Sequence, residues 1–407
     1  MADAKRYIAA QFGARRAYAV PAILERAGML EAFYTDLCGN VGAGLALSRL
    51  VPSRLQTAAI QRLVRREVPA EIKNKTVTFP LPTLRHVLRN LNGRYNSLLG
   101  NDLWWDQFDA DLGRSMARRG LGQANHIFSM AGECLPFLEY ARQHGAVIVT
   151  EFYSMPSRRN IEQDEWRRFP DLQEEPTDAY VQSYVEKQKK IRDLTDWFIA
   201  PSPHVIEDLV NNFGVPRDRC FMVPYAVHER WLEVQNEPEI GRVLFVGAAN
   251  MGKGIHYLGM ASQLLDPARY HFRVVGGIPP AVRQHPLCQG LDFAGFVMRS
   301  AIQQEYRQAD VFTLPSLYEG SAEVIYEALA CGIPVVTTPA AGSVVRDGVE
   351  GFIVPERDPQ ALAQRIQQIV EDRDLRARMA RAARERARDH TWAQYAERLS
   401  AVFQRIP

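Results

Sequence analysis

The chain of 407 residues is too long for one hydrophobic core of ordinary size, so its length predicts two domains of roughly 150 to 200 residues each. Charged residues make up 24% and hydrophobic residues 46% of the chain, as in soluble globular proteins, and the formal net charge of +2 excludes any bulk attraction to nucleic acid. The five cysteines are scattered and form no C-x-x-C pair, so we expect a cytoplasmic chain without disulfides or structural zinc. No apolar run approaches the 18 residues of a membrane span, and charged residues appear too early for a signal peptide.

Short apolar runs alternate with helical patterns along the whole chain. This alternation is typical of parallel sheets covered by helices, so we expect an α/β fold. The expected strands are residues 6–12, 33–37, 126–130, 146–151, 198–202, 220–223, 243–247, 271–276, 311–316 and 335–338.

Two strand ends in the first half carry polar residues. The first strand runs into Gly13, which permits close backbone approach, and Arg15 and Arg16 follow. The strand at 146–151 is apolar until Glu151, and Tyr153 comes shortly after it. A carboxylate at such an end lies on the cleft side of the sheet, where burial perturbs its pKa. Glu151 is therefore a candidate for orienting or deprotonating a substrate hydroxyl, with a structural acid bonded to backbone amides as the alternative.

Residues 42–120 are predicted to be mostly helical and locally basic. Between positions 49 and 94 there are ten lysines and arginines against two glutamates, and an apolar stripe at 84, 87, 88, 91 and 98 lies beside Arg85 and Arg89. This pattern suits a peripheral surface for anionic lipid. An ordinary amphipathic helix packed on its own domain is the alternative, and we favour it.

Residues 229–241 are polar and show no apolar period, which predicts an interdomain linker. We therefore expect a first Rossmann-like domain at 1–228 and a second at 242–390, with a final helical segment at 391–407. In such a pair of domains, ligands belong at the carboxyl ends of the strands, in the cleft between the two sheets.

The stretch Gly247-x4-Gly252-Lys253 matches a nucleoside triphosphatase phosphate loop up to its lysine. The next residue would have to be Ser or Thr to hold Mg²⁺, but it is Gly254. The chain is therefore not expected to be an NTPase of this type.

The most informative stretch is 314–355, where an apolar strand runs into a turn with Glu319 and Gly320 and a helix is expected to open at Ser321. Glu327 lies inside that helix, and a carboxylate can accept two hydrogen bonds from a vicinal diol. A helix N-terminus offers free N–H groups and a positive dipole end to phosphates. A nucleotide-sugar suits this arrangement, and the amides expected to hold its phosphates are those of Gly320, Ser321, Ala322 and Glu323.

The spacing Glu319-x7-Glu327, followed by Ala-Leu-Ala-Cys-Gly-Ile-Pro-Val-Val, resembles the signature of family 4 retaining glycosyltransferases with the GT-B fold. The resemblance implies two Rossmann-like domains that face a central cleft, with a C-terminal helix crossing back to the first domain. It also implies that Glu327 binds the ribose of the donor nucleotide and that Glu319 lies against the transferred sugar.

Further stretches of the second half resemble the same family. Lys253 matches a lysine that clamps the donor diphosphate, but Ala248 stands where the family has a second cation, an arginine. Val297 lies in a Gly-Phe-Val stretch that matches the loop around the nucleotide base, and Gly276 leaves room for the nucleotide.

The missing charge at position 248 leads to a hypothesis about the first domain. Arg15 or Arg16 would partly replace it, or else hold an anionic acceptor; two arginines that open a solvated helix are the alternative. The histidine that retaining members often place near the sugar has no counterpart after Glu151.

Asp109 and Asp111 spell the D-x-D pattern of metal-dependent glycosyltransferases of another fold. They lie in a helical pattern whose apolar face includes Phe108 and Leu112, so we interpret them as helix surface and expect no metal and no cofactor. The expected function is metal-independent, retaining transfer of a sugar from a nucleoside-diphosphate donor to the hydroxyl of a glycan, a glycolipid or a small molecule. A weak nucleotide-sugar-binding protein acting as an assembly partner, or a sugar-nucleotide epimerase of the same fold, is the alternative.

Overall fold

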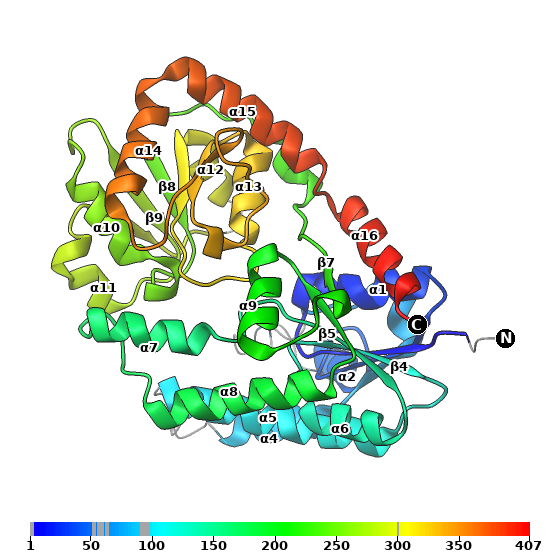
Figure 1. Cartoon of the computed structure of the whole chain (residues 1–407). Helices are drawn as coiled ribbons and strands as arrows, with labels where there is room; N and C mark the ends of the chain where they lie inside the picture. Colours follow the sequence, from blue (N-terminus) through cyan, green and yellow to red (C-terminus); the bar gives the residue numbers. More distant parts are fainter. Residues whose placement is uncertain (1–3, 51–53, 55–60, 62–64, 90–97, 299–300) are drawn as a thin grey trace.

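The computed structural model describes residues 4–50, 54, 61, 65–89, 98–298 and 301–407. Figure 1 shows two lobes, each built on a parallel sheet, with the N-terminal lobe drawn in blue to green and the other in yellow-green to orange. We refer to these lobes as the first and the second domain.

The first domain contains a seven-stranded sheet in the order β3-β2-β1-β4-β5-β6-β7, and every neighbouring pair is parallel. Its strands are β1 (Tyr7–Ala10), β2 (Leu30–Thr35), β3 (Thr76–Thr78), β4 (His126–Met130), β5 (Val147–Glu151), β6 (Trp197–Ala200) and β7 (Cys220–Met222). Its described α-helices are α1 (Ala19–Arg26), α2 (Gly42–Leu50), α4 (Pro80–Arg89), α5 (Leu98–Arg119), α6 (Leu135–Gln143), α7 (Arg158–Arg168), α8 (Asp178–Leu194) and α9 (Pro203–Phe213).

The second domain contains a six-stranded parallel sheet in the order β10-β9-β8-β11-β12-β13. Its strands are β8 (Arg242–Val246), β9 (His271–Val275), β10 (Leu291–Gly295), β11 (Val311–Leu314), β12 (Val335–Thr337) and β13 (Gly351–Ile353). Its described α-helices are α10 (Ile255–Gln263), α11 (Pro280–Gln284), α12 (Ile302–Gln308), α13 (Glu323–Cys331), α14 (Pro359–Glu371) and α15 (Arg373–Arg388). Both sheets reverse their strand order beside the first strand of the domain, which is the Rossmann-like arrangement predicted from the sequence.

The first sheet is covered on both faces because the side chains of its strands alternate. Tyr7 and Ala9 belong to one buried cluster, and Ile8 and Ala10 belong to another that includes Phe137. Since successive residues of a strand point to opposite faces, β1 is apolar throughout.

The final helix, α16 (Trp392–Arg405), returns to the first domain, as the fold prediction requires. Figure 1 shows α15 leading from the second domain and α16 lying beside α1. Phe403 packs against Tyr7 with ring centroids 5.1 Å apart, and the Lys5 ammonium donates to the carbonyl of Gln404 at 2.8 Å.

All ten predicted strands are present, with ends shifted by a few residues at most. The prediction missed β3, β10 and β13. Each of these three lies at the edge of its sheet, and two of them contain only three residues. Edge strands need little buried apolar surface, so their sequences carry a weak periodic signal.

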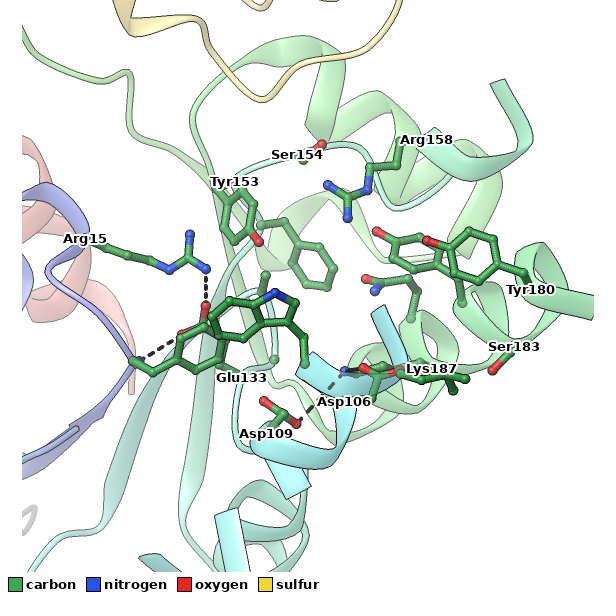
Figure 2. Close-up of a pocket in the computed structure, with 18 of the residues that line it drawn as sticks. Arg15, Asp106, Asp109, Glu133, Tyr153, Ser154, Arg158, Tyr180, Ser183 and Lys187 are labelled. Carbon is green, nitrogen blue, oxygen red and sulfur yellow. Dashed lines mark hydrogen bonds and ion pairs between the residues drawn. The ribbon is translucent and has the colours of Figure 1, made fainter. Parts of the chain in front are cut away.

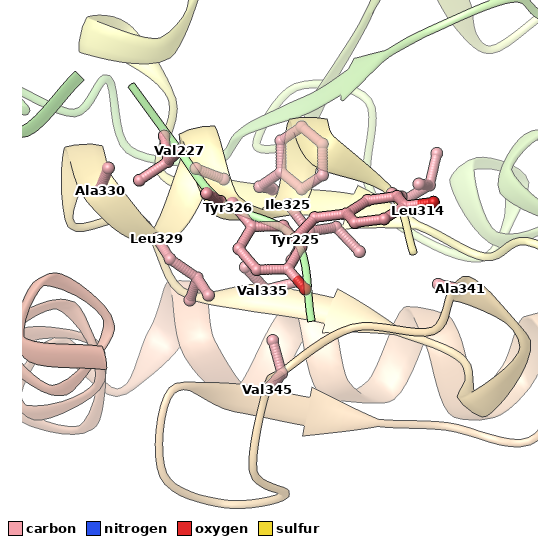
Figure 3. Close-up of a cluster of buried hydrophobic side chains, with 14 of the residues drawn as sticks. Tyr225, Val227, Leu314, Ile325, Tyr326, Leu329, Ala330, Val335, Ala341 and Val345 are labelled. Carbon is pink, nitrogen blue, oxygen red and sulfur yellow. The ribbon is translucent and has the colours of Figure 1, made fainter. Parts of the chain in front are cut away.

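The segment predicted to be a polar linker is packed against the second domain. Its Trp231 is only 4% exposed, and the Asn236 side chain donates to three backbone carbonyls, among them that of Ala309 at 2.9 Å. Just before this segment, Tyr225 and Val227 reach into the buried cluster around Leu329, as Figure 3 shows.

The interpretation of residues 84–98 as a helix whose apolar stripe packs on its own domain is wrong for α4. Leu81, Leu84, Val87 and Leu88 are 50–65% exposed, and it is His86 that is buried. Position 91 lies outside the described residues. None of the described helices has the length and apolarity that crossing a membrane requires.

Candidate functional site

Two loops of the second domain bring Lys253 and Glu319 together. Lys253 follows β8 and Glu319 follows β11, and these two strands are neighbours in the sheet. The Lys253 ammonium contacts the Glu319 carboxylate. A Cβ atom added to Gly252 would lie 2.4 Å from the Tyr318 ring, so the close approach of the two loops requires a glycine there.

Glu327 lies on α13, which begins two residues later than predicted. The hydroxyl of Tyr306 donates to the Glu327 carboxylate at 2.8 Å, and Tyr306 is fully buried. Burial is the main reason why the pKa of Tyr306 is raised, and the neighbouring carboxylate adds to this effect. Tyr306 therefore fixes the orientation of Glu327, and no local sequence signal at Tyr306 indicates this role.

The amide groups before α13 were predicted to face a phosphate. The Ala322 amide donates to the carbonyl of Ala341 at 3.1 Å, so this donor is used within the protein. Glu323, the first residue of α13, gives this helix a second carboxyl group, and burial raises the pKa of that group. For Gly320, Ser321 and Glu323 the phosphate-binding role stays a prediction.

Gly276 and Val297 lie at the ends of the next two strands of the sheet. The Gly276 amide donates to the Gly295 carbonyl at 2.9 Å, and a Cβ atom at Gly276 would lie 2.0 Å from the Gly247 carbonyl oxygen. The loops that follow β8, β9 and β10 are therefore adjacent. Beside Val297, Phe296 and Met298 are exposed at 86% and 69%.

The turn that carries Glu319 lies against the first domain. Ser202 donates to the Gly320 carbonyl at 2.6 Å. A Cβ atom at Gly320 would lie only 1.7 Å from the carbonyl oxygen of Tyr153. Tyr153, predicted from its position after β5, thus borders the turn of the other domain that carries Glu319.

Arg16 and Glu151 form a buried ion pair at 2.5 Å. The Arg16 guanidinium also lies 3.8 Å from the ring centroid of Tyr225 and donates to the Tyr395 hydroxyl at 2.9 Å. Arg16, Ala17 and Tyr18 all adopt the left-handed backbone conformation, which is costly for residues other than glycine. Arg16 is thus committed to Glu151 and two tyrosines.

Arg15 points in a different direction and pairs with Glu133 at 2.6 Å. Burial raises the pKa of Glu133 to about 8, although Arg15 and the amide of Phe12 oppose this effect. Gly13 donates its amide to Asp36 at 2.9 Å. Sequence reasoning missed Glu133, although its position just after the buried strand β4 is a signal for a polar residue at the cleft.

Arg15, Glu133 and Tyr153 line a cavity of about 650 Å³ in the first domain. Figure 2 shows Arg15 on one side of the cavity and Arg158, Tyr180 and Lys187 on the other. The helices contribute Asp109, Arg158, Tyr180, Tyr184 and Lys187.

The interpretation of Asp109 and Asp111 as helix surface is wrong. Asp109 is 6% exposed and accepts from the Cys134 amide at 2.6 Å, and Asp111, 8% exposed, pairs with Arg89 at 2.7 Å. The two residues differ in their partners because they lie on different sides of α5.

Residues 241–372 match the family model described as "Glycosyl transferases group 1". The D-inositol 3-phosphate glycosyltransferase of Xylanimonas cellulosilytica is 30% identical over 253 residues, which cover 54% of this chain and 60% of that protein. The sulfoquinovosyl transferase SQD2 of Arabidopsis thaliana is 29% identical over 220 residues, covering 49% of this chain and 42% of that protein. The chain thus matches about half the length of these curated relatives.

Two solved structures share the whole architecture. Anabaena Alr3699/HepE, crystallised in complex with UDP and glucose, has a TM-score of 0.63 and 15% identity, covering 99% of this chain and all of that one. The sucrose-phosphate synthase of Thermosynechococcus elongatus has a TM-score of 0.62 and 17% identity, covering 98% of both chains. At this level of identity, the likeness shows the fold.

Proposed function

Because residues 241–372 match the group 1 glycosyl transferases, we propose that the chain is a family 4 glycosyltransferase with the GT-B fold that moves a sugar from a nucleoside-diphosphate donor to an acceptor hydroxyl. The observation that carries the proposal is the contact of Lys253 with Glu319 in a turn that also closes against the first domain. A cation, a carboxylate and a helix N-terminus then meet where the two domains touch. Retention at the anomeric carbon and independence of metal ions are parts of the proposal.

In this mechanism the second domain binds the donor. Glu327, oriented by Tyr306, accepts hydrogen bonds from the ribose, and Lys253 neutralises the diphosphate. The N-terminus of α13 stabilises the charge that develops on the leaving phosphate, because its dipoles are fixed before the reaction starts. Glu319 orients the transferred sugar.

Because Ala248 stands where the family has an arginine, one of the two cations expected at the donor diphosphate is absent from this loop. Arg16 is paired with Glu151 and Arg15 with Glu133, so both arginines lie in the first domain with carboxylate partners. This arrangement favours the second half of our hypothesis, in which Arg15 acts on the acceptor side. Glu151 remains a candidate for handling the proton of the acceptor hydroxyl, although it is paired with Arg16.

We test donor binding by thermal shift with UDP, GDP, ADP and CMP and their common sugars. A ligand at a hundred times its Kd stabilises by about 2.7 kcal/mol. Glu327→Gln should abolish the shift, because a neutral amide is a weaker acceptor for the ribose diol. Tyr306→Phe is the matched probe of orientation and should weaken binding without removing it. No shift with any nucleotide in a folded protein would contradict the proposal, and a shift without transfer or donor hydrolysis would favour the assembly-partner alternative.

We further propose that α4 contacts an anionic membrane surface. Its four exposed apolar side chains lie beside Arg85, and two further exposed apolar residues, Leu103 and Trp105 on α5, line the cavity and are 47% and 39% exposed. Such a face combines apolar burial with attraction to anionic lipid.

The membrane contact is tested by co-sedimentation with vesicles of phosphatidylcholine, with and without phosphatidylglycerol. Leu84→Ser combined with Leu88→Ser should reduce sedimentation with the anionic vesicles. Leu264→Ser, at a 53% exposed position of the second domain, should not. Equal sedimentation of all the proteins would contradict this part of the proposal.

A further inference from the structure

The cavity in the first domain adjoins the proposed reaction site but is separate from the donor loops. It lies at the carboxyl ends of β1, β4 and β5, and its wall includes Tyr153 and Ser154. These same two residues meet Gly320 of the second domain. A molecule in the cavity can therefore present a hydroxyl to the sugar while the rest of it extends toward α8.

The cationic residues of the cavity differ in whether a carboxylate pairs with them. Arg15 pairs with Glu133 at 2.6 Å, and Lys187 pairs with Asp106 at 2.6 Å. Arg158 differs, because none of the carboxylates in the described part of the chain forms an ion pair with it. Its Nε atom is buried without a hydrogen-bond partner, and its guanidinium lies 5.1 Å from the ring centroid of Tyr184.

The position of Arg158 makes this cation available to a ligand. Figure 2 shows it at one end of the cavity, with the guanidinium turned toward the interior. It is the first residue of α7, so the positive end of that helix dipole adds to its charge. The next residue, Arg159, differs from Arg158 because its guanidinium contacts the Glu162 carboxylate. Arg158 is partly buried, and removing a cation from water is costly unless it is paired, so a ligand can supply the pair here.

We propose that the acceptor carries an anionic group of phosphate or carboxylate type and that Arg158 binds this group in the cavity. This inference rests on the proposed function. The planar guanidinium forms two parallel hydrogen bonds with either group. Trp105 lines the same cavity and is 39% exposed, so its ring offers a face for the body of the acceptor, as aromatic side chains do in sugar-sized pockets.

The test compares three hexoses that differ in one substituent: glucose 6-phosphate, glucuronate and glucose. Binding to the full chain is measured by calorimetry at one ionic strength, with the donor site filled by the nucleotide that gives the largest thermal shift. The filled donor site prevents the phosphate probe from binding at Lys253. We expect the two anionic hexoses to bind at least about tenfold more tightly than glucose, as charge-assisted hydrogen bonds do.

Variants of α7 assign the effect to Arg158. Arg158→Gln should remove the preference for the anionic hexoses, and Arg158→Lys should keep part of it because the charge remains without the two-pronged geometry. Arg167→Gln, which changes a 60% exposed arginine of the same helix, is the matched control and should bind like the wild type. Nucleotide binding should be unchanged in all three variants.

A lipid arm identifies the source of the anion. Vesicles of phosphatidylcholine mixed with phosphatidic acid that bind in an Arg158-dependent way would indicate a lipid phosphate, whereas binding of the soluble hexoses alone would indicate a free acceptor. The inference is wrong if glucose binds as tightly as the anionic hexoses, or if Arg158→Gln leaves anion binding intact. If instead the wild type binds none of the nucleotides, the proposed function is overturned. The two failures are therefore distinguishable.

Discussion

Ser202 of the first domain donates a 2.6 Å hydrogen bond to the carbonyl of Gly320 in the second, across 118 positions of the chain. A second contact between the domains surrounds Glu165 on α7. His256, Tyr257 and Arg357 of the second domain donate to its carboxylate at 2.9, 2.6 and 2.7 Å. Contacts at the turn that carries Glu319 and around Glu165 thus both contribute to the relative position of the domains. Variants at these two points should separate domain closure from folding.

Gly320→Ala should prevent closure. The new methyl group would meet the Tyr153 carbonyl, so the domains must move apart while each sheet stays folded. Small-angle scattering should show a larger radius of gyration, and donor turnover should fall at least tenfold because water enters the site. Ser202→Ala removes one hydrogen bond, worth about 1 kcal/mol, and should give a smaller effect. An unchanged radius in Gly320→Ala would show that the turn rearranges instead.

Glu165→Ala should weaken the second contact. Although burial acts in the opposite direction, hydrogen bonds from His256, Tyr257 and Arg357 hold the pKa of Glu165 at about 2. Its contribution is therefore complete above the ordinary pKa of 4.5 and is lost as the pH falls toward 2. The variant leaves buried donors unpaired, so we expect a loss of about 3 kcal/mol in the free energy of unfolding at pH 7.

The neighbouring residue provides the control for Glu165. Asp164 pairs with Arg357 at 3.0 Å but is 49% exposed, so Asp164→Ala should cost less than about 1 kcal/mol. Denaturant unfolding of both variants measures the difference. Equal losses would show that the buried donors around Glu165 find other partners.

His390 should make the protein less stable in mild acid. Burial, with Arg398 and Arg386 nearby, lowers its pKa from 6.5 to about 4. The unfolded chain therefore binds a proton more readily below pH 6.5, and stability falls as the pH drops from there toward 4. The maximal effect is about 3 kcal/mol, because one pKa unit corresponds to 1.36 kcal/mol. His390→Gln should reduce the fall in melting temperature between pH 7.5 and pH 5, and parallel curves would contradict this assignment.

The buried pair of Arg16 and Glu151 should be sensitive to the loss of either partner. Glu151→Gln removes the charge that compensates Arg16, so we expect a loss of about 3 kcal/mol or more in the free energy of unfolding. The double variant Arg16→Met with Glu151→Met should recover part of that loss, because no uncompensated charge remains. A double-mutant cycle measures the coupling, and additive losses would show that the two residues act independently.

Ala17→Gly should stabilise the protein. Ala17 is the middle residue of the left-handed run, with φ at 50°, and glycine adopts this conformation without a steric cost. The expected gain is about 1 kcal/mol, measured by thermal or denaturant unfolding. Ala22→Gly, inside α1, is the matched control and should destabilise by a similar amount. Destabilisation by both substitutions would show that the backbone at Ala17 is not strained.

The fold was predictable because its central strands are buried on both faces. Continuous apolar runs such as the one ending at Glu151 mark those strands, and glycine turns mark their ends. The sequence also located Lys253 and Glu319, because both follow central strands. The three missed edge strands are short and have less apolar surface to bury.

The cavity was less predictable, because half of its wall comes from helices. Arg158 and Lys187 lie on α7 and α8, and nothing in their local sequence distinguishes them from solvent-exposed cations. Asp109 was misplaced for the same reason, since its burial depends on the backbone of Cys134, 25 positions away. Side chains that are buried by distant segments leave no periodic signal in their own segment.

The return of α16 to the first domain has a consequence for synthesis on the ribosome. Phe403 and Tyr7 belong to one core, yet α16 begins 170 positions after β7 ends at Met222. At about 5–20 residues per second, the first sheet waits roughly 10–30 seconds for its last covering helix. During that interval the surface of α1 is exposed while the second domain emerges, so the second domain can be complete before the first.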